Sequence, residues 1–295
     1  MNTRDKIDYK AIKESKTLLQ NAFNSAMAKI SRLPANDIQS VDLVNNIIKT
    51  EFDNISILLS DNIYNSAKDQ YYNAIKTQQL MAARTGEKLG YKFNATDKTM
   101  LDIFDDGGSL FVTQMYDNML QGKVVDELKK MVSEGKSLKD TKNDIADMIG
   151  LTGKKALSNL ASYIVTNNTW TRSIATTNLL ERADAKAYKY IVVLDAVTTD
   201  ICRALAGKEL PVDRAMQLRD DYMAIPRNNY DDFKAEIEQV SPLIAYDKEK
   251  EVYYKQSQAD NAYKQIWTKD NILDIPGIEL PPLHINCRTE IGIVY

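Results

Sequence analysis

The placement of proline is the feature that most constrains the fold of this chain. One of its seven prolines is Pro34, and the other six all follow residue 210. The stretch between Pro34 and Pro211 therefore contains no proline, and glycine is scarce in it. Helix interiors exclude proline and disfavour glycine, so this stretch is predicted to be mainly helical.

The clearest predicted helix runs from about Val41 to about Ala83. Its apolar residues recur at steps of three and four and so share one face: Val44, Ile48, Phe52, Ile55, Leu59 and Ile63. Such a stripe needs a partner, and we expect it to pack against a helix over residues 9–30, near Leu18 to Met27. The opposite face is expected to meet solvent or a polar partner through Lys49, Glu51, Asn54 and Asp61.

Shorter helices are predicted in the rest of this stretch. Asp105-Asp106-Gly107-Gly108 predicts a break, followed by a helix through Met115 to Met119. Ser137-Leu138-Lys139-Asp140 fits a capping box, so another helix is expected from Ser137 to Gly150. Two more helices are expected between Leu151 and about Ala187.

The character of the chain changes at Tyr188. Residues Tyr188 to Leu194 are β-branched or aromatic and predict a strand, and Glu290 to Tyr295 predict a last strand. We expect these segments to pair around Leu194 and Ile293. A charged insert at about 214–274 is expected to form one or two surface helices. The prediction is a predominantly α-helical α+β protein, with a helical region at 1–150 and a small α+β domain at 151–295.

Composition restricts the classes of partner. The net charge is −3 and the pI is near 5.5, so no overall positive field attracts nucleic acid, and any contact with DNA is expected to be local and weak. No segment approaches 18 consecutive apolar residues, and Met1 to Lys6 do not lead into an apolar segment. We therefore expect neither a membrane span nor a signal peptide. Two cysteines without a secretion signal indicate a reducing compartment, the cytosol, at least initially.

The rarest residues that can act as nucleophiles or metal ligands are Cys202, His284 and Cys287, since the chain has two cysteines and one histidine. Strand-like segments flank both groups, so pairing of the strands is expected to bring the three side chains into contact. Three interpretations follow. The cysteines are small buried side chains beside a hydrogen-bonded histidine, or the three residues bind zinc, or the cysteines form a disulfide. Zinc prefers four ligands, so Asp195, Asp200 or water would have to supply the fourth.

Enzyme motifs are scarce. Gly135-Lys136-Ser137 resembles the end of a phosphate-binding loop, but Lys130 stands where that loop needs its first glycine. No G-x-S-x-G elbow is present. A Cys–His hydrolase, with Cys202 or Cys287 activated by His284, is the remaining nucleophilic option. No glycine-rich turn is placed to form its oxyanion hole, so we expect no enzymatic activity.

Two short motifs near the carboxyl terminus resemble a known family. A D-x-x-T-x-x-x-C-R segment with a following G-K, and a later P-P-L-H-x-x-C-R segment, are similar to the C-terminal signature of the Mu F-like head-morphogenesis family of tailed phages. The matching residues are Asp195, Thr198, Cys202, Arg203, Gly207, Lys208, Pro281, Pro282, His284, Cys287 and Arg288.

The chain departs from the family in three places. The family's I-A-R-T-E helix corresponds here to Ile174-Ala175-Thr176-Thr177-Asn178, which lacks the arginine and the glutamate. Some members carry additional cysteines where this chain has Thr199 and Thr289. Those members are the stronger zinc candidates, so the departures weaken the case for zinc.

The resemblance implies a minor head protein of the virion, present in few copies near the portal and needed for head morphogenesis. Its implied partners are the portal protein and other head proteins, and it would be assembled into heads in the host cytoplasm. Asp195 and Arg288 are expected to be structural. The alternative is a phage or prophage structural adaptor unrelated to the head.

Overall fold

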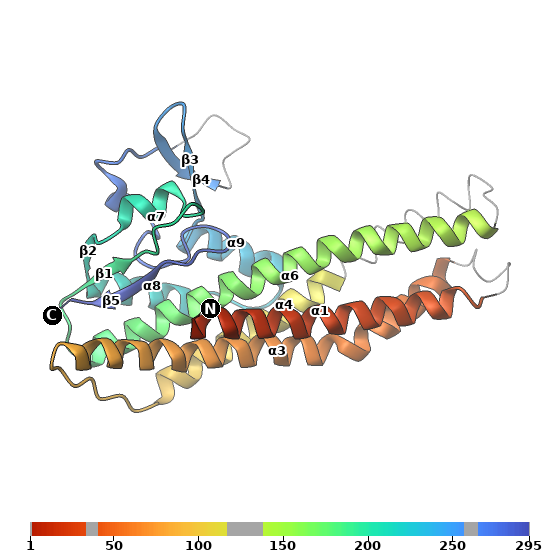
Figure 1. Ribbon diagram of the computed structural model, residues 1–295, viewed down its shortest axis with the longest axis horizontal. Helices are drawn as coiled ribbons and strands as arrows, with labels where there is room; N and C mark the ends of the chain where they lie inside the picture. The colour runs from red at the N-terminus through yellow and green to blue at the C-terminus, as the bar shows by residue number, and fades with distance from the viewer. Residues whose placement is uncertain (1, 34–40, 117–137, 257–264, 295) are drawn as a thin grey trace. The chain divides into compact units, whose positions relative to one another are not determined.

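The computed structural model describes residues 2–33, 41–116, 138–256 and 265–294 (Figure 1). The helices in these ranges are α1 (Thr3–Ile30), α3 (Val41–Arg84), α4 (Ala95–Tyr116), α6 (Leu138–Arg182), α7 (Asp200–Leu205), α8 (Val212–Ala224), α9 (Tyr230–Val240) and the 3-10 turn η3 (Ile272–Asp274). The strands are β1 (Ala187–Ile191), β2 (Glu209–Pro211), β3 (Ile244–Asp247), β4 (Val252–Lys255) and β5 (Glu290–Ile293). The predicted class, a predominantly helical α+β fold, is confirmed. No helix in the described ranges is long and apolar enough to cross a membrane.

The chain forms two compact units, and each is assembled from several segments. One unit contains residues 1–8, 66–104 and 165–295, and the other contains 9–65 and 105–164. Neither unit ends at the expected boundary at residue 150, because α6 continues through it without a break. The boundaries between the units fall inside the helices α1, α3, α4 and α6. No linker sequence marks them, so they could not be predicted from the sequence.

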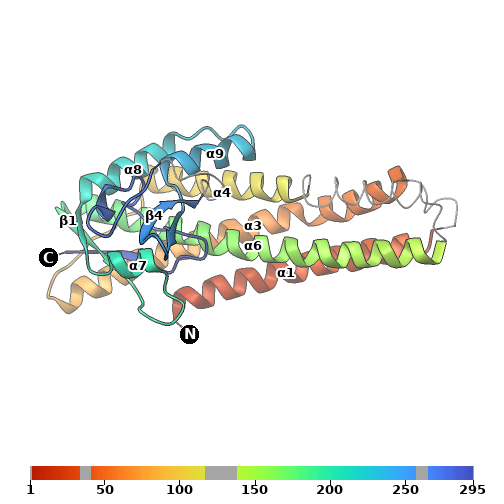
Figure 2. The same ribbon diagram turned by 90° about the horizontal axis from the view of Figure 1, so that it is seen from above.

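In the unit of residues 9–65 and 105–164, α1 and α3 are antiparallel (Figure 2). The rings of Phe23 and Phe52 meet edge to face at 5.4 Å between centroids, and Asn62 donates a hydrogen bond to the Ala11 carbonyl (2.8 Å). The predicted stripe is buried except for Ile55, which is half-buried. Glu51, expected on the outward face, is instead buried because Lys29 of α1 forms an ion pair with it.

The break expected at Gly107-Gly108 is wrong, because α4 continues through both glycines. A β-carbon on Gly108 would lie 3.1 Å from Cγ2 of Ile63, so this glycine allows α4 to approach α3 closely. Further along α4, Phe111 stacks on Tyr163 of α6 at 3.9 Å between ring centroids. Met119, the expected end of that helix, lies outside the described residues.

The prediction of a helix end at Gly150, with two further helices behind it, is also wrong. A single helix, α6, runs from Leu138 to Arg182. Its expected cap, Ser137, lies outside the described residues. Glycine in a helix interior costs only about 1 kcal/mol, which tertiary packing readily offsets.

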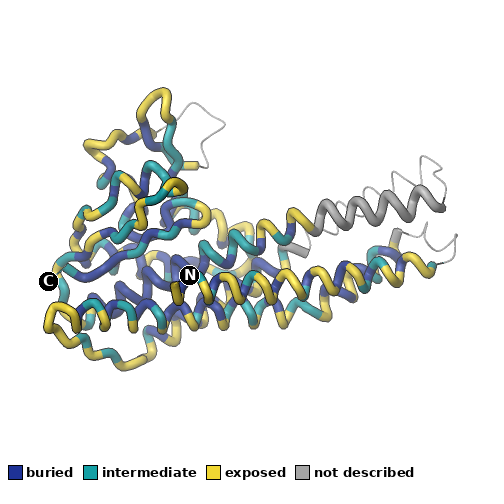
Figure 3. Tube along the Cα trace, viewed as in Figure 1, coloured by how far each residue is buried: buried dark blue, intermediate teal, exposed yellow. Residues whose placement is uncertain are grey.

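The carboxyl-terminal part of α6 is the core of the unit of residues 1–8, 66–104 and 165–295 (Figure 3). All fourteen residues from Asn167 to Leu180 are buried, although many are polar. Five of the hydroxyls donate to the carbonyl four residues earlier in the helix, namely those of Thr169, Thr171, Ser173, Thr176 and Thr177. Asn168 donates to Asp8 (2.7 Å) and to Ser66 (2.6 Å), so α6 joins α1 and α3 through polar contacts.

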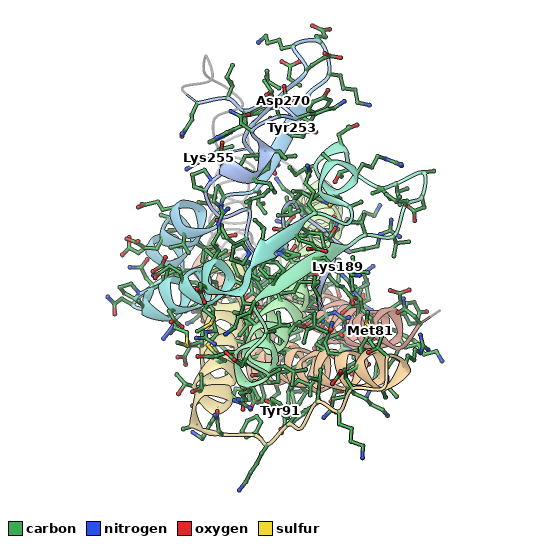
Figure 4. The ribbon with its side chains drawn as sticks, turned by 90° about the vertical axis from the view of Figure 1, so that its left-hand side faces the viewer. Met81, Tyr91, Lys189, Tyr253, Lys255 and Asp270 are labelled. Atoms are coloured by element: carbon green, nitrogen blue, oxygen red, sulfur yellow. The ribbon has the colours of Figure 1, made fainter. Side chains whose placement is uncertain are left out.

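The charged insert is more than a pair of surface helices. Tyr222 of α8 is buried, stacks on Trp170 of α6 at 4.7 Å and contacts Phe104 and Phe233. Arg219, also buried, forms ion pairs with Glu181 and Asp220. The insert also contains the antiparallel β3–β4 hairpin, which carries Tyr253 and Lys255 (Figure 4). Part of the insert, residues 257–264, lies outside the described ranges.

A three-stranded antiparallel sheet has the order β2-β1-β5, with Lys189 on the central strand (Figure 4). Strand β1 ends at Ile191, earlier than predicted, and Leu194 is exposed beyond it. Ile293 therefore pairs with Tyr188, while Glu290 pairs with Ile191. Because β1 and β5 are antiparallel, the segment that follows β1 and the segment that precedes β5 meet at one end of the sheet.

Candidate metal centre

The two motif segments meet at that end of the sheet. Cys202 lies in α7, which follows the loop after β1, and its side chain is buried together with Ile201 and Leu205. A loop and the start of α7 therefore separate Cys202 from β1. His284 and Cys287 lie in the segment before β5. The pairing of Ile191 with Glu290 fixes the distance between the two segments.

The expected proximity of Cys202, His284 and Cys287 is confirmed. Cys202 Sγ lies 3.2 Å from His284 Nε2 and 3.8 Å from Cys287 Sγ. The three potential ligand atoms all lie within 4.8 Å of one another. Both cysteines are free thiols, so the disulfide alternative does not describe this structure.

The orientation of the histidine favours metal binding. His284 Nδ1 lies 2.8 Å from the Ile285 carbonyl, which can only accept a hydrogen bond. The Nδ1 atom must therefore carry the proton, and the lone pair of neutral His284 is on Nε2, the nitrogen that faces Cys202. Metal-binding histidines commonly donate their second N–H in this way, because the hydrogen bond fixes both tautomer and ring orientation.

The two thiols share one hydrogen bond, which shifts their pKa values in opposite directions. The hydrogen bond from Cys202 lowers the pKa of Cys287 well below its ordinary value, against the effect of burial. The same hydrogen bond, together with burial, raises the pKa of Cys202. The group thus favours one thiolate beside an imidazole.

The separation of the two sulfurs fits a metal ion. In a tetrahedral site with Zn–S bonds of about 2.3 Å, two thiolate sulfurs lie roughly 3.8 Å apart. The observed separation of the sulfurs is 3.8 Å. Neither Asp195 nor Asp200, the acidic residues considered as fourth ligands, belongs to the group that the described residues form. Cys202, His284 and Cys287 can therefore hold a metal ion as three ligands.

Asp195 instead joins the two segments by an ion pair. Arg288 Nη2 lies 2.7 Å from Asp195 Oδ1, and this contact lowers the pKa of the Asp195 carboxyl. Thr198 accepts a hydrogen bond from the Asp195 N–H (2.8 Å) and donates one to the Val193 carbonyl (2.6 Å). Arg203 donates to the carbonyls of Thr198 and Asp195. These motif residues hold the shape of the loop before α7.

The other motif residues position α7 and the segment before β5. Gly207 has a φ of +74°, and its N–H donates to the Tyr190 carbonyl of β1 (3.0 Å). The neighbouring Lys208 carbonyl accepts from the Tyr190 N–H (3.0 Å), so the end of α7 is attached to the sheet. Pro281 and Pro282 are buried and joined by a cis peptide bond.

Sequence reasoning missed the buried arginines that support this centre. Arg4 donates to the carbonyls of Cys287 (2.9 Å) and Arg288 (2.6 Å), and Thr169 donates to the Cys287 carbonyl (2.8 Å). Glu290 forms ion pairs with both Arg4 (3.1 Å) and Arg172. Arg4 is 284 residues from Arg288, and no local pattern connects them. The one signal in the sequence is Arg172, the only basic residue between Lys155 and Arg182.

Comparisons with protein-family models, with curated proteins and with solved structures give no match for this chain. The arrangement itself consists of two thiols and an imidazole, which can hold a metal ion, within loops that are fixed by Arg288, Arg203 and Arg4.

We expect Arg288→Ala to loosen the loop before α7, because the Asp195 carboxylate loses its partner while still accepting from the Val197 N–H. Hydrogen exchange at Val197 and Thr198 should accelerate. Arg288→Lys, which keeps the charge, should show a smaller change. Unchanged exchange in Arg288→Ala would contradict a structural role.

Proposed function

We propose that this chain is a minor head protein of tailed phages, of the Mu F-like family, and acts as a structural component near the portal during head morphogenesis. The observation that carries the proposal is that the residues of the two motifs form one compact site. Cys202 contacts His284 across 82 residues, and Asp195 contacts Arg288 across 93 residues. The motif residues thus join separate segments of the chain, as residues of a structural signature should.

The geometry favours this role over a Cys–His hydrolase. Cys202 and Cys287 are 2% and 0% exposed, respectively. The cavity beside Cys202 and His284 has a volume of about 30 Å³, whereas pockets for small-molecule ligands measure roughly 300–1,000 Å³. A thiol in this position has room for a water molecule but not for an acyl substrate.

The helical unit of residues 9–65 and 105–164 offers a surface for a protein partner. A groove of about 740 Å³ lies between α1 and α3, and Tyr9 and Leu58 are exposed within its lining. We propose that the portal protein, or another head protein, contacts this face. Contact with packaged DNA, if present, would be weak, because the net charge of the chain is −3.

Co-purification tests the proposed partner. The full chain, carrying an affinity tag, is expected to retain the portal protein encoded by the same phage. Leu58→Asp should weaken retention, while Leu80→Asp, the same substitution at an exposed leucine outside the groove, should not. Immunogold labelling of purified virions should mark the portal vertex. Labelling elsewhere on the particle, without portal retention, would favour the structural adaptor.

We further propose that the ion held by Cys202, His284 and Cys287 is zinc, since thiolate and imidazole are its preferred ligands. The full chain purified with zinc is expected to contain about one zinc per chain by elemental analysis. The Cys202→Ser/Cys287→Ser double variant should lose it, and Ala196→Ser, on the neighbouring exposed loop, should retain it. The chain has two cysteines and one histidine, so thiolate-bound zinc has no second location. A wild-type chain without zinc would contradict this proposal.

A further inference from the structure

A small cavity adjoins two of the three ligand side chains of the candidate metal centre. Its lining includes Cys202, His284, Thr198, Thr199 and Thr289, and its volume is about 30 Å³. A water molecule needs roughly 10–15 Å³ of such volume and two to four polar partners. The cavity is therefore large enough for a water molecule, and its lining is polar on the side of the threonines.

One hydroxyl in this lining, that of Thr199, makes no hydrogen bond to an oxygen or nitrogen atom of the described residues. Thr199 is the residue before α7, the usual position of a capping side chain, yet its hydroxyl makes no capping hydrogen bond. Thr199 Oγ1 is buried and has no oxygen or nitrogen partner among the described residues. The hydroxyl lies beside the Cys202 thiol, and a hydrogen bond between them lowers the pKa of that thiol, against the larger effects that raise it. Sulfur is a weak hydrogen-bond partner, so the buried hydroxyl can still accept a hydrogen bond from a stronger donor next to Cys202.

The coordination of zinc leaves the same position to be filled. Zinc sites in proteins are almost always four-coordinate, and sites with three protein ligands complete the set with water or substrate. The chain supplies three ligand atoms, while the Asp195 carboxylate is engaged by Arg288. The cavity is too small for a side chain of a partner protein to enter beside these ligands.

From these observations we propose that zinc at this centre takes a water molecule as its fourth ligand, which occupies the cavity and donates a hydrogen bond to the Thr199 hydroxyl. This inference rests on the proposed zinc site. A zinc ion with a water ligand can exchange that ligand, whereas a zinc ion held by four side chains is purely structural. Thr199 is then a positioning residue for the fourth ligand. The ligands that can replace the water are restricted by the cavity to small anions.

X-ray absorption at the zinc edge tests the proposal on the full chain loaded with one equivalent of zinc. We expect two sulfur neighbours at about 2.3 Å and two nitrogen or oxygen neighbours at about 2.0–2.2 Å. Three or four sulfur neighbours in the wild-type chain would overturn the proposal, since the zinc would then bridge two chains. A chain that binds no zinc would overturn both this proposal and the proposed zinc site. The two failures are thus distinguishable.

Two substitutions at Thr199 locate the fourth position. Thr199→Cys should raise the number of sulfur neighbours from two to three, because its thiol replaces the water. Ala196→Cys places a thiol on the same loop at an exposed position and should leave the number at two. Thr199→Val should keep one zinc per chain and weaken its affinity by about tenfold, as loss of an outer-shell hydrogen bond does. If Thr199→Cys retains two sulfur neighbours, or Thr199→Val binds zinc with unchanged affinity, Thr199 does not face the fourth position and the proposal is wrong.

Discussion

Glu290→Gln is expected to lower the free energy of unfolding by about 3 kcal/mol, the lower end of the cost of removing one partner from a buried ion pair, because the Glu290 side chain is itself 25% exposed. Glu290 forms ion pairs with Arg4 and with Arg172, whose side chains are 7% and 6% exposed. Without the shared carboxylate, two buried guanidinium groups repel each other. The coulombic effect of Arg4 already lowers the pKa of Arg172, in addition to the larger effect of burial.

Urea denaturation at neutral pH measures this loss, and the chain provides a matched control. Glu209→Gln makes the same change on strand β2 of the same sheet at an exposed position, and it should alter stability by less than about 0.5 kcal/mol. Adding Arg172→Met to Glu290→Gln should recover part of the loss, because the uncompensated charge is removed. If Glu290→Gln costs less than about 1 kcal/mol, the carboxylate does not neutralise the two arginines.

Phe52→Ala is expected to cost about 3–5 kcal/mol, the range for deleting a buried aromatic ring. Phe52 is buried in the contact between α1 and α3, where its ring meets that of Phe23. The same unfolding assay measures the effect. Ile57→Ala, five residues further along α3 at a side chain that is 71% exposed, should change stability by less than about 0.5 kcal/mol. A loss below about 1 kcal/mol for Phe52→Ala would contradict its place in the core.

The helices whose apolar residues recur at a regular helical spacing could be predicted from the sequence. Helix α3 was expected from about Val41 to about Ala83 and runs from Val41 to Arg84, since its apolar stripe is uninterrupted. The errors arose where packing overrides local preference. Gly108 suggests a break in isolation, but its lack of a side chain allows contact with Ile63. Glu51 has the chemistry of an exposed residue, but Lys29 from another helix neutralises it.

The candidate site could be predicted in part for a different reason. Cys202, His284 and Cys287 are conspicuous because cysteine and histidine are rare in this chain. Arg4 and Thr169 support the same centre, but arginine and threonine are common residues and do not stand out in the sequence. Arg4 lies 283 residues and Thr169 lies 118 residues from Cys287, whose carbonyl both contact. The polar interior of α6 also escaped prediction, because a helix buried on all sides has no stripe to recognise.

The edge of strand β5 is closed by a side chain. Gln78 of α3 donates to the Ile291 carbonyl (2.9 Å) and accepts from the Ile293 N–H (3.4 Å), as a neighbouring strand would do. A β-carbon on Gly292, between these two residues, would collide with Ile191 at 2.5 Å. An open strand edge invites pairing with other chains and aggregation. By occupying these backbone groups, Gln78 makes β5 a poor template for another strand, which disfavours association of this chain with other polypeptides through the edge of the sheet.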